Sequence, residues 1–213
     1  MIIPRMMAGQ NVMWPALLKG IKNWIQANMI VRPNLDPKFR LSKFSLGARQ
    51  AFLTVSERIA DGKVDSLQGL VTKEVLDSVK KATSSLSMAD HELFRRQDSD
   101  IYLCFPYELG IIFEDNDPLK RWVEVMMVFH TLQGFEALQK DNVSVTDIQK
   151  KPIANKFLFA NFKFSRNYSK GVKLEDSDWT INYINYFTPE GDFEEEKKKH
   201  EASSPPSSSS SST

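Results

Sequence analysis

The spacing of the apolar residues changes once along this chain, near residue 98, from a helical period to an alternating one. Before that point, large side chains recur every three or four positions, which places them on one stripe of a helix. After it, long apolar runs are separated by turn residues, as is typical of strands. Helices first and strands second predict an α+β fold, in which N-terminal helices pack on one face of a curved, mainly antiparallel four-stranded sheet.

The clearest helical stripe starts near Ser42 and ends at Asp61-Gly62, where glycine can take the left-handed conformation that ends many helices. A capping box at Ser87 and Asp90 predicts one more helical turn or two. Three other helices are expected over 14–31, near 65–70 and over 72–83. The residues of the main stripe are Phe44, Ala48, Phe52, Val55 and Ile59.

Four strands are expected, over 101–113, 121–132, 157–168 and 179–187. Pro106 lies in the first of them and indicates an edge or a bulge, because proline cannot donate to the sheet ladder. The second strand is apolar on both faces, so both faces are expected to be covered. Residues 133–152 are expected to form a long polar loop. One face of the second strand is formed by Val123, Val125, Met127 and Phe129.

A pocket is also expected, because helices that cover one face of a curved sheet often leave an apolar space against it. The alternative is that the same side chains fill the core completely. The candidate pocket-lining residues are Phe157, Phe159, Trp179 and Tyr183.

The N-terminus carries basic residues but no carboxylate before Asp36. An acid-free, basic, amphipathic segment is typical of a mitochondrial targeting region. It also suits a helix that lies on a membrane surface with anionic lipid, such as cardiolipin. Residues 1–13 have no periodicity and are expected to be disordered. The candidate membrane-surface residues are Trp14, Lys19, Lys22 and Trp24, the alternative being that Trp14, Leu18, Ile21 and Ile25 pack on the domain.

The sequence shows no spacing typical of catalysis or metal binding. His91, His130 and His200 are far apart, and none stands at ligand spacing with another His or Cys. The single cysteine, Cys104, lies in an apolar run and suits a reducing compartment. The acidic pairs Asp98/Asp100 and Asp115/Asp117 fall in turns, where Asp is expected for backbone reasons. We therefore expect no enzyme, no metal and no cofactor, and the net charge of +1 gives no drive toward DNA.

Composition divides the chain into three parts. Residues 1–35 form the basic amphipathic segment, and 36–188 the α+β domain. Residues 189–213 are charged and Ser-rich, cannot bury apolar surface, and are expected to be a disordered tail.

Several stretches of residues 36–188 carry a family resemblance, among them Asp36-Pro-Lys-Phe39, Phe44-Ser-Leu-Gly-Ala-Arg-Gln-Ala-Phe52, Asp65-Ser-Leu-Gln-Gly-Leu-Val71, Gly171-Val-Lys173 and Asp178-Trp-Thr-Ile181. With these stretches, the chain resembles the m-AAA protease-interacting proteins of mitochondria. It is also similar to a wider group that shares the C-terminal domain of the import-motor tethering subunit of the inner-membrane translocase.

The resemblance implies a mitochondrial matrix protein, peripheral to the inner membrane and without enzymatic activity. It implies an adaptor that binds the m-AAA protease and assists the sorting or protection of newly imported membrane proteins, such as the calcium uniporter regulatory subunit. The alternative is a mitochondrial ribosome or translocase tether, because the wider group contains both. A ribosome binder is expected to cluster Lys and Arg more strongly, since phosphate contacts drive RNA affinity. A third class is an enzyme or ligand carrier that uses the pocket.

Overall fold

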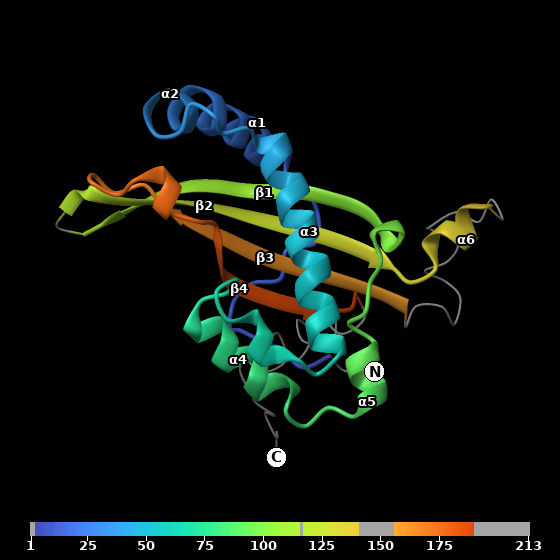
Figure 1. Cartoon of the computed structure of the whole chain (residues 1–213). Coiled ribbons are helices and arrows are strands. Elements are labelled where there is room, and N and C mark those ends of the chain that lie inside the picture. Colours follow the sequence, from blue (N-terminus) through green and yellow to red (C-terminus); the bar gives the residue numbers. More distant parts are fainter. Residues whose placement is uncertain (1–2, 116, 141–155, 190–213) are drawn as a thin grey trace, which may run out of the picture.

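The protein is an antiparallel sheet crossed on one face by a long helix, as a computed structural model describes it for residues 3–115, 117–140 and 156–189 (Figure 1). The strands lie in the order β1-β2-β3-β4. This arrangement confirms the α+β prediction. The strands are β1 (Ile101–Glu114), β2 (Asp117–Leu132), β3 (Phe157–Asn167) and β4 (Thr180–Phe187), and the main helices are α1 (Leu17–Ile25), α3 (Leu41–Ala60), α4 (Lys73–Thr83) and α5 (Met88–Glu92).

The face of the sheet that α3 crosses holds the main core, and we call it the helix face. Phe52 of α3 stacks on Phe129 of β2 with ring centroids 4.5 Å apart. Ser56, one turn further on, shares a hydrogen bond of 2.8 Å with the hydroxyl of Tyr186 in β4. The predicted stripe is confirmed, since its last four members are fully buried and Phe44 is partly buried against the same core. These contacts fill the layer between α3 and the sheet.

Three helix ends follow the predicted signals, whereas α3 begins at Leu41, directly after Arg40, without a side-chain cap from Ser42. Gly62 has φ of 68° directly after α3, in the left-handed region that glycine tolerates. The Thr72 side chain accepts a hydrogen bond from the amide of Val75 and caps α4. Ser87 and Asp90 form a capping box at α5. The shorter elements are η1 (Gln26–Val31, a π-helix), α2 (Arg32–Asn34), η2 (Val64–Leu67), η3 (Asp98–Asp100) and η5 (Leu174–Asp176).

Each edge of the sheet is covered over part of its length. β1 is an edge strand with a register shift at Pro106, as the proline predicted. Helix α1 packs along that edge (Figure 1). At the other edge, Ile181 of β4 donates to the carbonyl of Leu70 and accepts from the amide of Thr72. Covered edges remove the unpaired backbone groups that would otherwise pair with another chain.

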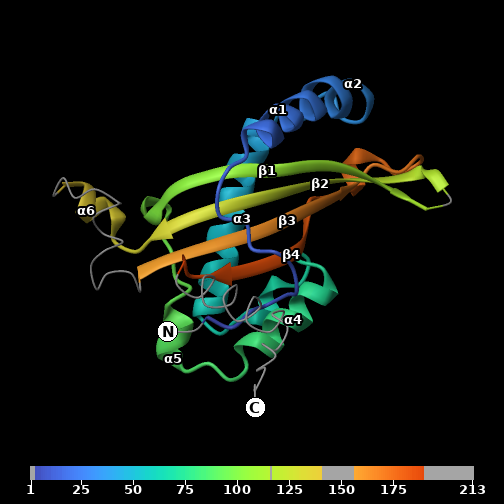
Figure 2. The same cartoon turned by 180° about the vertical axis from the view of Figure 1, so that it is seen from behind.

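The N-terminal residues cross the face of the sheet opposite α3, which we call the back face (Figure 2). The expectation that residues 1–13 are disordered is wrong for the described part, residues 3–13. Their amides and carbonyls bond to polar side chains that rise from β2, β3 and β4. Periodicity does not reveal such a segment, because it is held by backbone contacts and not by a helical or strand pattern.

The stretch after β2 also differs from the prediction of a plain loop. It turns at Gly134, which has φ of 77°, and forms α6 (Phe135–Lys140). Phe135 and Leu138 pack against a small apolar cluster on the back face. The predicted loop beyond residue 140 and the predicted tail beyond residue 189 lie outside the described residues.

Candidate functional site

The most unusual surface of the protein is the outward side of α1 and η1. Its large apolar side chains are exposed, with Leu17 and Leu18 at 89% and 82% and Trp24 at 61%. A contiguous exposed apolar surface of this size is typical of an interaction site. We call this set the α1 apolar face, and it comprises Leu17, Leu18, Ile21, Trp24, Ile25, Met29 and Ile30. Trp14 is also exposed, but it precedes α1, and its ring packs edge-on against His130 on the back face at 5.6 Å.

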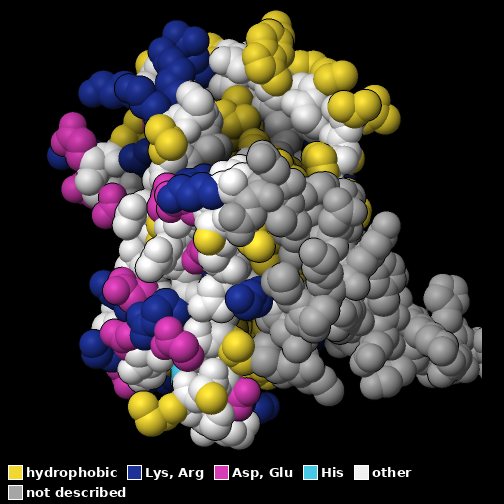
Figure 3. Space-filling model, turned by 90° about the vertical axis from the view of Figure 1, so that its right-hand side faces the viewer, with side chains coloured by type: hydrophobic (Ala, Val, Ile, Leu, Met, Phe, Trp, Pro, Cys, Tyr) yellow, Lys and Arg dark blue, Asp and Glu magenta, His cyan; other side chains and the backbone are white. Residues whose placement is uncertain are grey.

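The space-filling view shows where the α1 apolar face lies relative to the charged side chains. Hydrophobic side chains gather at the upper end of the molecule, where Figure 1 places α1 and α2, next to a group of Lys and Arg side chains (Figure 3). The acidic side chains visible on this side lie lower. The exposure of Leu18, Ile21 and Ile25, at least 41% each, argues against the alternative that they pack on the domain, whereas Trp14 does contact the ring of His130.

A polar residue turns α1 so that its apolar side faces outward. Asn23 is 2% exposed and lies against the edge strand β1. Its carboxamide donates to the carbonyls of Pro106 and Tyr107 and accepts from the amide of Leu109 at 2.8 Å. These backbone groups belong to the edge strand β1 and lie on either side of its register shift. Because a buried unpaired backbone group costs about 1–3 kcal/mol, Asn23 fixes the helix to this edge.

The two lysines of α1 have different surroundings. The ammonium of Lys19 bonds to Glu108 at 3.1 Å and lies 4.0 Å above the ring of Tyr107. Lys22 lines a hollow of about 410 Å³ between α1 and the sheet, next to Gln26. Lys19 therefore helps to hold the helix in place. Lys22 is the α1 lysine that is exposed beside the α1 apolar face.

The four candidate pocket-lining residues do not share one place in the structure. Phe157 and Phe159 are buried in the small back-face cluster with Leu132. Trp179 is on the helix face, with its ring 4.6 Å from that of Phe44. Tyr183 is on the back face, where its hydroxyl is buried with no hydrogen-bond partner. The apolar pocket stays a prediction.

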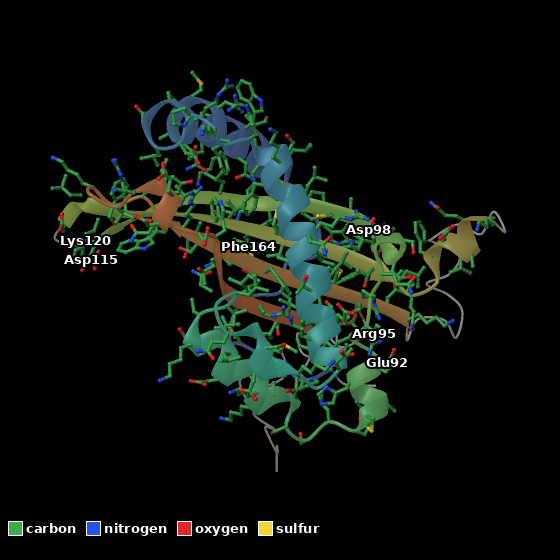
Figure 4. The ribbon with its side chains drawn as sticks, in the orientation of Figure 1. Glu92, Arg95, Asp98, Asp115, Lys120 and Phe164 are labelled. Carbon is green, nitrogen blue, oxygen red and sulfur yellow. The ribbon has the colours of Figure 1, made fainter. Side chains whose placement is uncertain are left out.

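The ionisable residues that the sequence singled out sit in structural surroundings. Burial raises the pKa of Cys104 to about 11, which keeps its thiol protonated. Asp98 forms an ion pair with Arg49, and Asp100 accepts hydrogen bonds from the amides of Gln97 and Gly134. Asp115, at the β1–β2 turn, lies far along the sheet from Asp98 (Figure 4). Within residues 3–115, 117–140 and 156–189, no group of three or more His, Cys, Asp or Glu could hold a metal ion.

Sequence reasoning missed three of the residues that arrange these surfaces, namely Asn23, Asn161 and Asn185. Each is at most 2% exposed and bonds to a backbone group or side chain of another segment. A signal was present in the strands, since Asn161 and Asn185 interrupt otherwise apolar runs. Buried carboxamides are almost always hydrogen-bonded, so each one predicts a partner segment.

An α+β domain with an exposed apolar helix face is typical of proteins that act by binding other molecules. A comparison with models of known protein families finds no match. Curated proteins do match. The m-AAA protease-interacting protein 1, mitochondrial, of Rattus norvegicus and that of Mus musculus are each 29% identical to the chain over 172 residues, and that of Homo sapiens is 27% identical over the same length.

Each alignment covers 77% of this chain and 57% of the relative. The chain thus spans less than two thirds of the length of the curated relatives it matches. These relatives confirm the resemblance that the helical stretches and the last strand indicated. They are named as mitochondrial and as interacting proteins. None of the helices in the described part of the chain is long and apolar enough to cross a membrane.

Proposed function

We propose that this chain is a non-enzymatic adaptor that binds the m-AAA protease on the matrix side of the mitochondrial inner membrane. The name of the relatives supports the partner, because it describes proteins that interact with this protease. The observation that carries the proposal is the α1 apolar face, which is large, exposed and hydrogen-bonded to the sheet edge through Asn23. An apolar surface that is already held in position needs little ordering when a partner binds.

The same face, together with Trp14 before it, supports a location at the membrane. Trp14 and Trp24 expose aromatic rings, and Lys22 adds a cation, in a region without acidic residues before Asp36. Aromatic rings and cations next to each other favour the boundary between lipid tails and anionic headgroups. Lys19, the fourth candidate membrane-surface residue, is engaged with Glu108 and contributes to the position of the helix. In this proposal, the adaptor assists the sorting or protection of newly imported membrane proteins, such as the calcium uniporter regulatory subunit.

The test is affinity purification of the tagged chain from gently solubilised mitochondria, with and without nuclease, followed by mass spectrometry. Recovery of m-AAA subunits regardless of nuclease would support the adaptor. Recovery of ribosomal proteins that nuclease removes would favour the ribosome tether, and recovery of translocase subunits the translocase tether.

A pair of variants locates the contact. Leu17→Gln/Ile21→Gln removes apolar area from the α1 apolar face, while glutamine remains a good helix former. Leu46→Gln/Met88→Gln is the matched control, because these two side chains are also exposed, on α3 and α5. Loss of the protease with the first variant but not with the second supports the proposal. Equal recovery with both variants would show that the protease binds elsewhere.

A further inference from the structure

The back face of the sheet carries a second binding surface, which the chain covers with its own N-terminus. Residues 3–14, which we call the strap, lie across β2, β3 and β4 (Figure 2). We call the surface beneath the strap the back-face groove. It is formed by the side chains of Met126, His130, Asn161, Tyr183 and Asn185.

Two neighbouring asparagines hold the strap by hydrogen bonds. Asn161 and Asn185 are cross-strand partners in β3 and β4, and both are buried. Asn161 accepts from the amide of Val12 at 2.6 Å and donates to the carbonyl of the same residue at 2.8 Å. A carboxamide that pairs with both backbone groups of one residue recognises the peptide backbone and not a particular side chain.

The second asparagine binds one backbone group and one side chain of the strap. Asn185 accepts from the amide of Met6 at 3.1 Å and donates to the side chain of Asn11 at 2.6 Å. The ring of His130 donates from Nε2 to the carbonyl of Met13 at 2.6 Å, since a carbonyl can only accept. Three buried polar side chains of the sheet are therefore used to hold the backbone of one segment.

The groove also selects for shape. A Cβ atom on Gly9 would lie 2.6 Å from the hydroxyl of Tyr183, so a side chain at this position would displace either that ring or the strap. Beside this contact a cavity of about 310 Å³ remains between the strap, Lys19 and the sheet. The hydroxyl of Tyr183 is buried there without a hydrogen-bond partner. The strap leaves part of the groove unfilled.

We propose that the back-face groove is a peptide-binding site that the strap occupies in cis. Its ligand in trans is an acid-free, apolar segment of another protein that carries glycine where it meets Tyr183. The chemistry is that of the strap itself, which contains methionines, one arginine and no carboxylate. This site is separate from the α1 apolar face, and it does not depend on the protease as partner.

Because the strap belongs to the same chain, a free peptide has to compete with it for the back-face groove. A tethered segment has an effective concentration of about 1 mM or more, so the unmodified chain masks its own groove. Opening the groove requires a change in the strap that leaves the sheet untouched. Gly9→Val does this, because the new side chain would collide with the Tyr183 ring.

The experiment uses the full chain, the Gly9→Val variant and a Gly110→Val control, in which the same substitution meets nothing within 4 Å. The probe is a fluorescein-labelled peptide with the sequence of residues 3–14, and its binding is followed by fluorescence polarisation. Release of the strap is followed separately, as the rate of trypsin cleavage after Arg5. We expect Gly9→Val to raise both the cleavage rate and the affinity for the peptide at least tenfold over the other two proteins.

A modified peptide tests the hydrogen bond between Asn161 and the backbone of Val12. Methylation of the Val12 nitrogen removes the donor to Asn161 without any change to the protein. It should weaken binding to Gly9→Val at least fivefold, and a scrambled peptide of the same composition should not bind.

Three results would overturn the proposal. The first is a released strap with no gain in peptide binding. The second is an unchanged cleavage rate in Gly9→Val, which would contradict the contact with Tyr183. The third is equal binding of the peptide to all three proteins, which would place it outside the groove.

Discussion

The guanidinium of Arg166 donates a hydrogen bond of 3.3 Å to the carboxylate of Asp36, although the two residues lie 130 positions apart. Asp36 is the first acidic residue of the chain and directly follows the N-terminal helices. The same carboxylate accepts from the hydroxyl of Tyr168, and Arg166 also donates to the carbonyls of Leu174 and Ser177. The pair thus joins the end of the helical segment, β3 and the loop before β4.

Removal of this carboxylate should be costly. Both side chains are largely buried, at 17% and 10% exposure, so Asp36→Ala leaves the cation of Arg166 without its counter-charge. We expect a loss of about 3 kcal/mol in the free energy of unfolding. Asp36→Asn should lose less, because the amide oxygen can still accept. Urea unfolding followed by tryptophan fluorescence measures both.

The control for this pair is Lys120→Ala, which breaks the ion pair with Glu114 near the β1–β2 turn (Figure 4). Both partners are about half exposed. The expected change is at most about 0.5 kcal/mol. A similar loss for Asp36→Ala and Lys120→Ala would contradict a structural role for the buried pair.

A second test concerns the hydroxyl pair between α3 and β4. Ser56→Ala leaves the fully buried hydroxyl of Tyr186 without its partner, and we expect a loss of about 1–2 kcal/mol. The double variant Ser56→Ala/Tyr186→Phe removes both polar atoms and should regain most of that loss. The double-mutant cycle, measured by urea unfolding, would exclude this account if the two single losses simply added.

Local patterns in the sequence were sufficient for most of the fold. The stripe of α3 depends only on spacing within one helix, and Pro106 revealed an edge because of its own chemistry. The four strands were found to within a few residues for the same reason. The α+β class followed from their order along the chain.

The candidate sites depend on contacts between distant segments, and here the sequence was less informative. A helical wheel shows that α1 has an apolar side, but not that Asn23 turns this side outward by bonding to β1. The strap has no period at all. Its position depends on two asparagines about 150 to 180 residues away, as their separations of 149 and 179 show.

The pH dependence of stability should reflect His130. The imidazole is fully buried among aromatic rings, and its Nδ1 has no hydrogen-bond partner. Burial lowers the pKa of His130 below its ordinary value, with the bond to Met13 acting in the opposite direction. The folded state therefore resists protonation, while the unfolded chain takes up a proton as the pH falls below about 6.5.

The direction of the pH effect on stability follows from the lower pKa of His130 in the folded state. The contribution of neutral His130 is fully present above the unfolded pKa and is lost progressively as the pH falls from there toward the lower folded pKa. We expect the urea midpoint to fall between pH 7.5 and pH 5.5. His130→Gln keeps a donor for the Met13 carbonyl but does not titrate, so its midpoint should change less over this range. An equal change in both proteins would assign the effect to other groups.

The two lysines of α1 should differ in their effect on lipid binding. Lys22 is exposed beside the α1 apolar face, whereas Lys19 is paired with Glu108. A basic residue near an anionic membrane contributes about 1 kcal/mol, so Lys22→Gln should weaken binding to cardiolipin-containing vesicles about fivefold. Lys81→Gln, on the exposed surface of α4, is the matched control and should leave binding unchanged. Vesicle co-sedimentation at low and physiological salt measures both.

Lys19→Gln distinguishes a lysine that holds α1 against β1 from one that binds lipid. Because it removes the ion pair with Glu108, it should loosen α1 from β1, which is detectable as faster hydrogen exchange at the amide of Leu109. Lys22→Gln should leave that exchange rate as it is. If Lys22→Gln and Lys81→Gln bind vesicles equally well, lipid is not the partner of this side of the helix, and the α1 apolar face is then left to a protein.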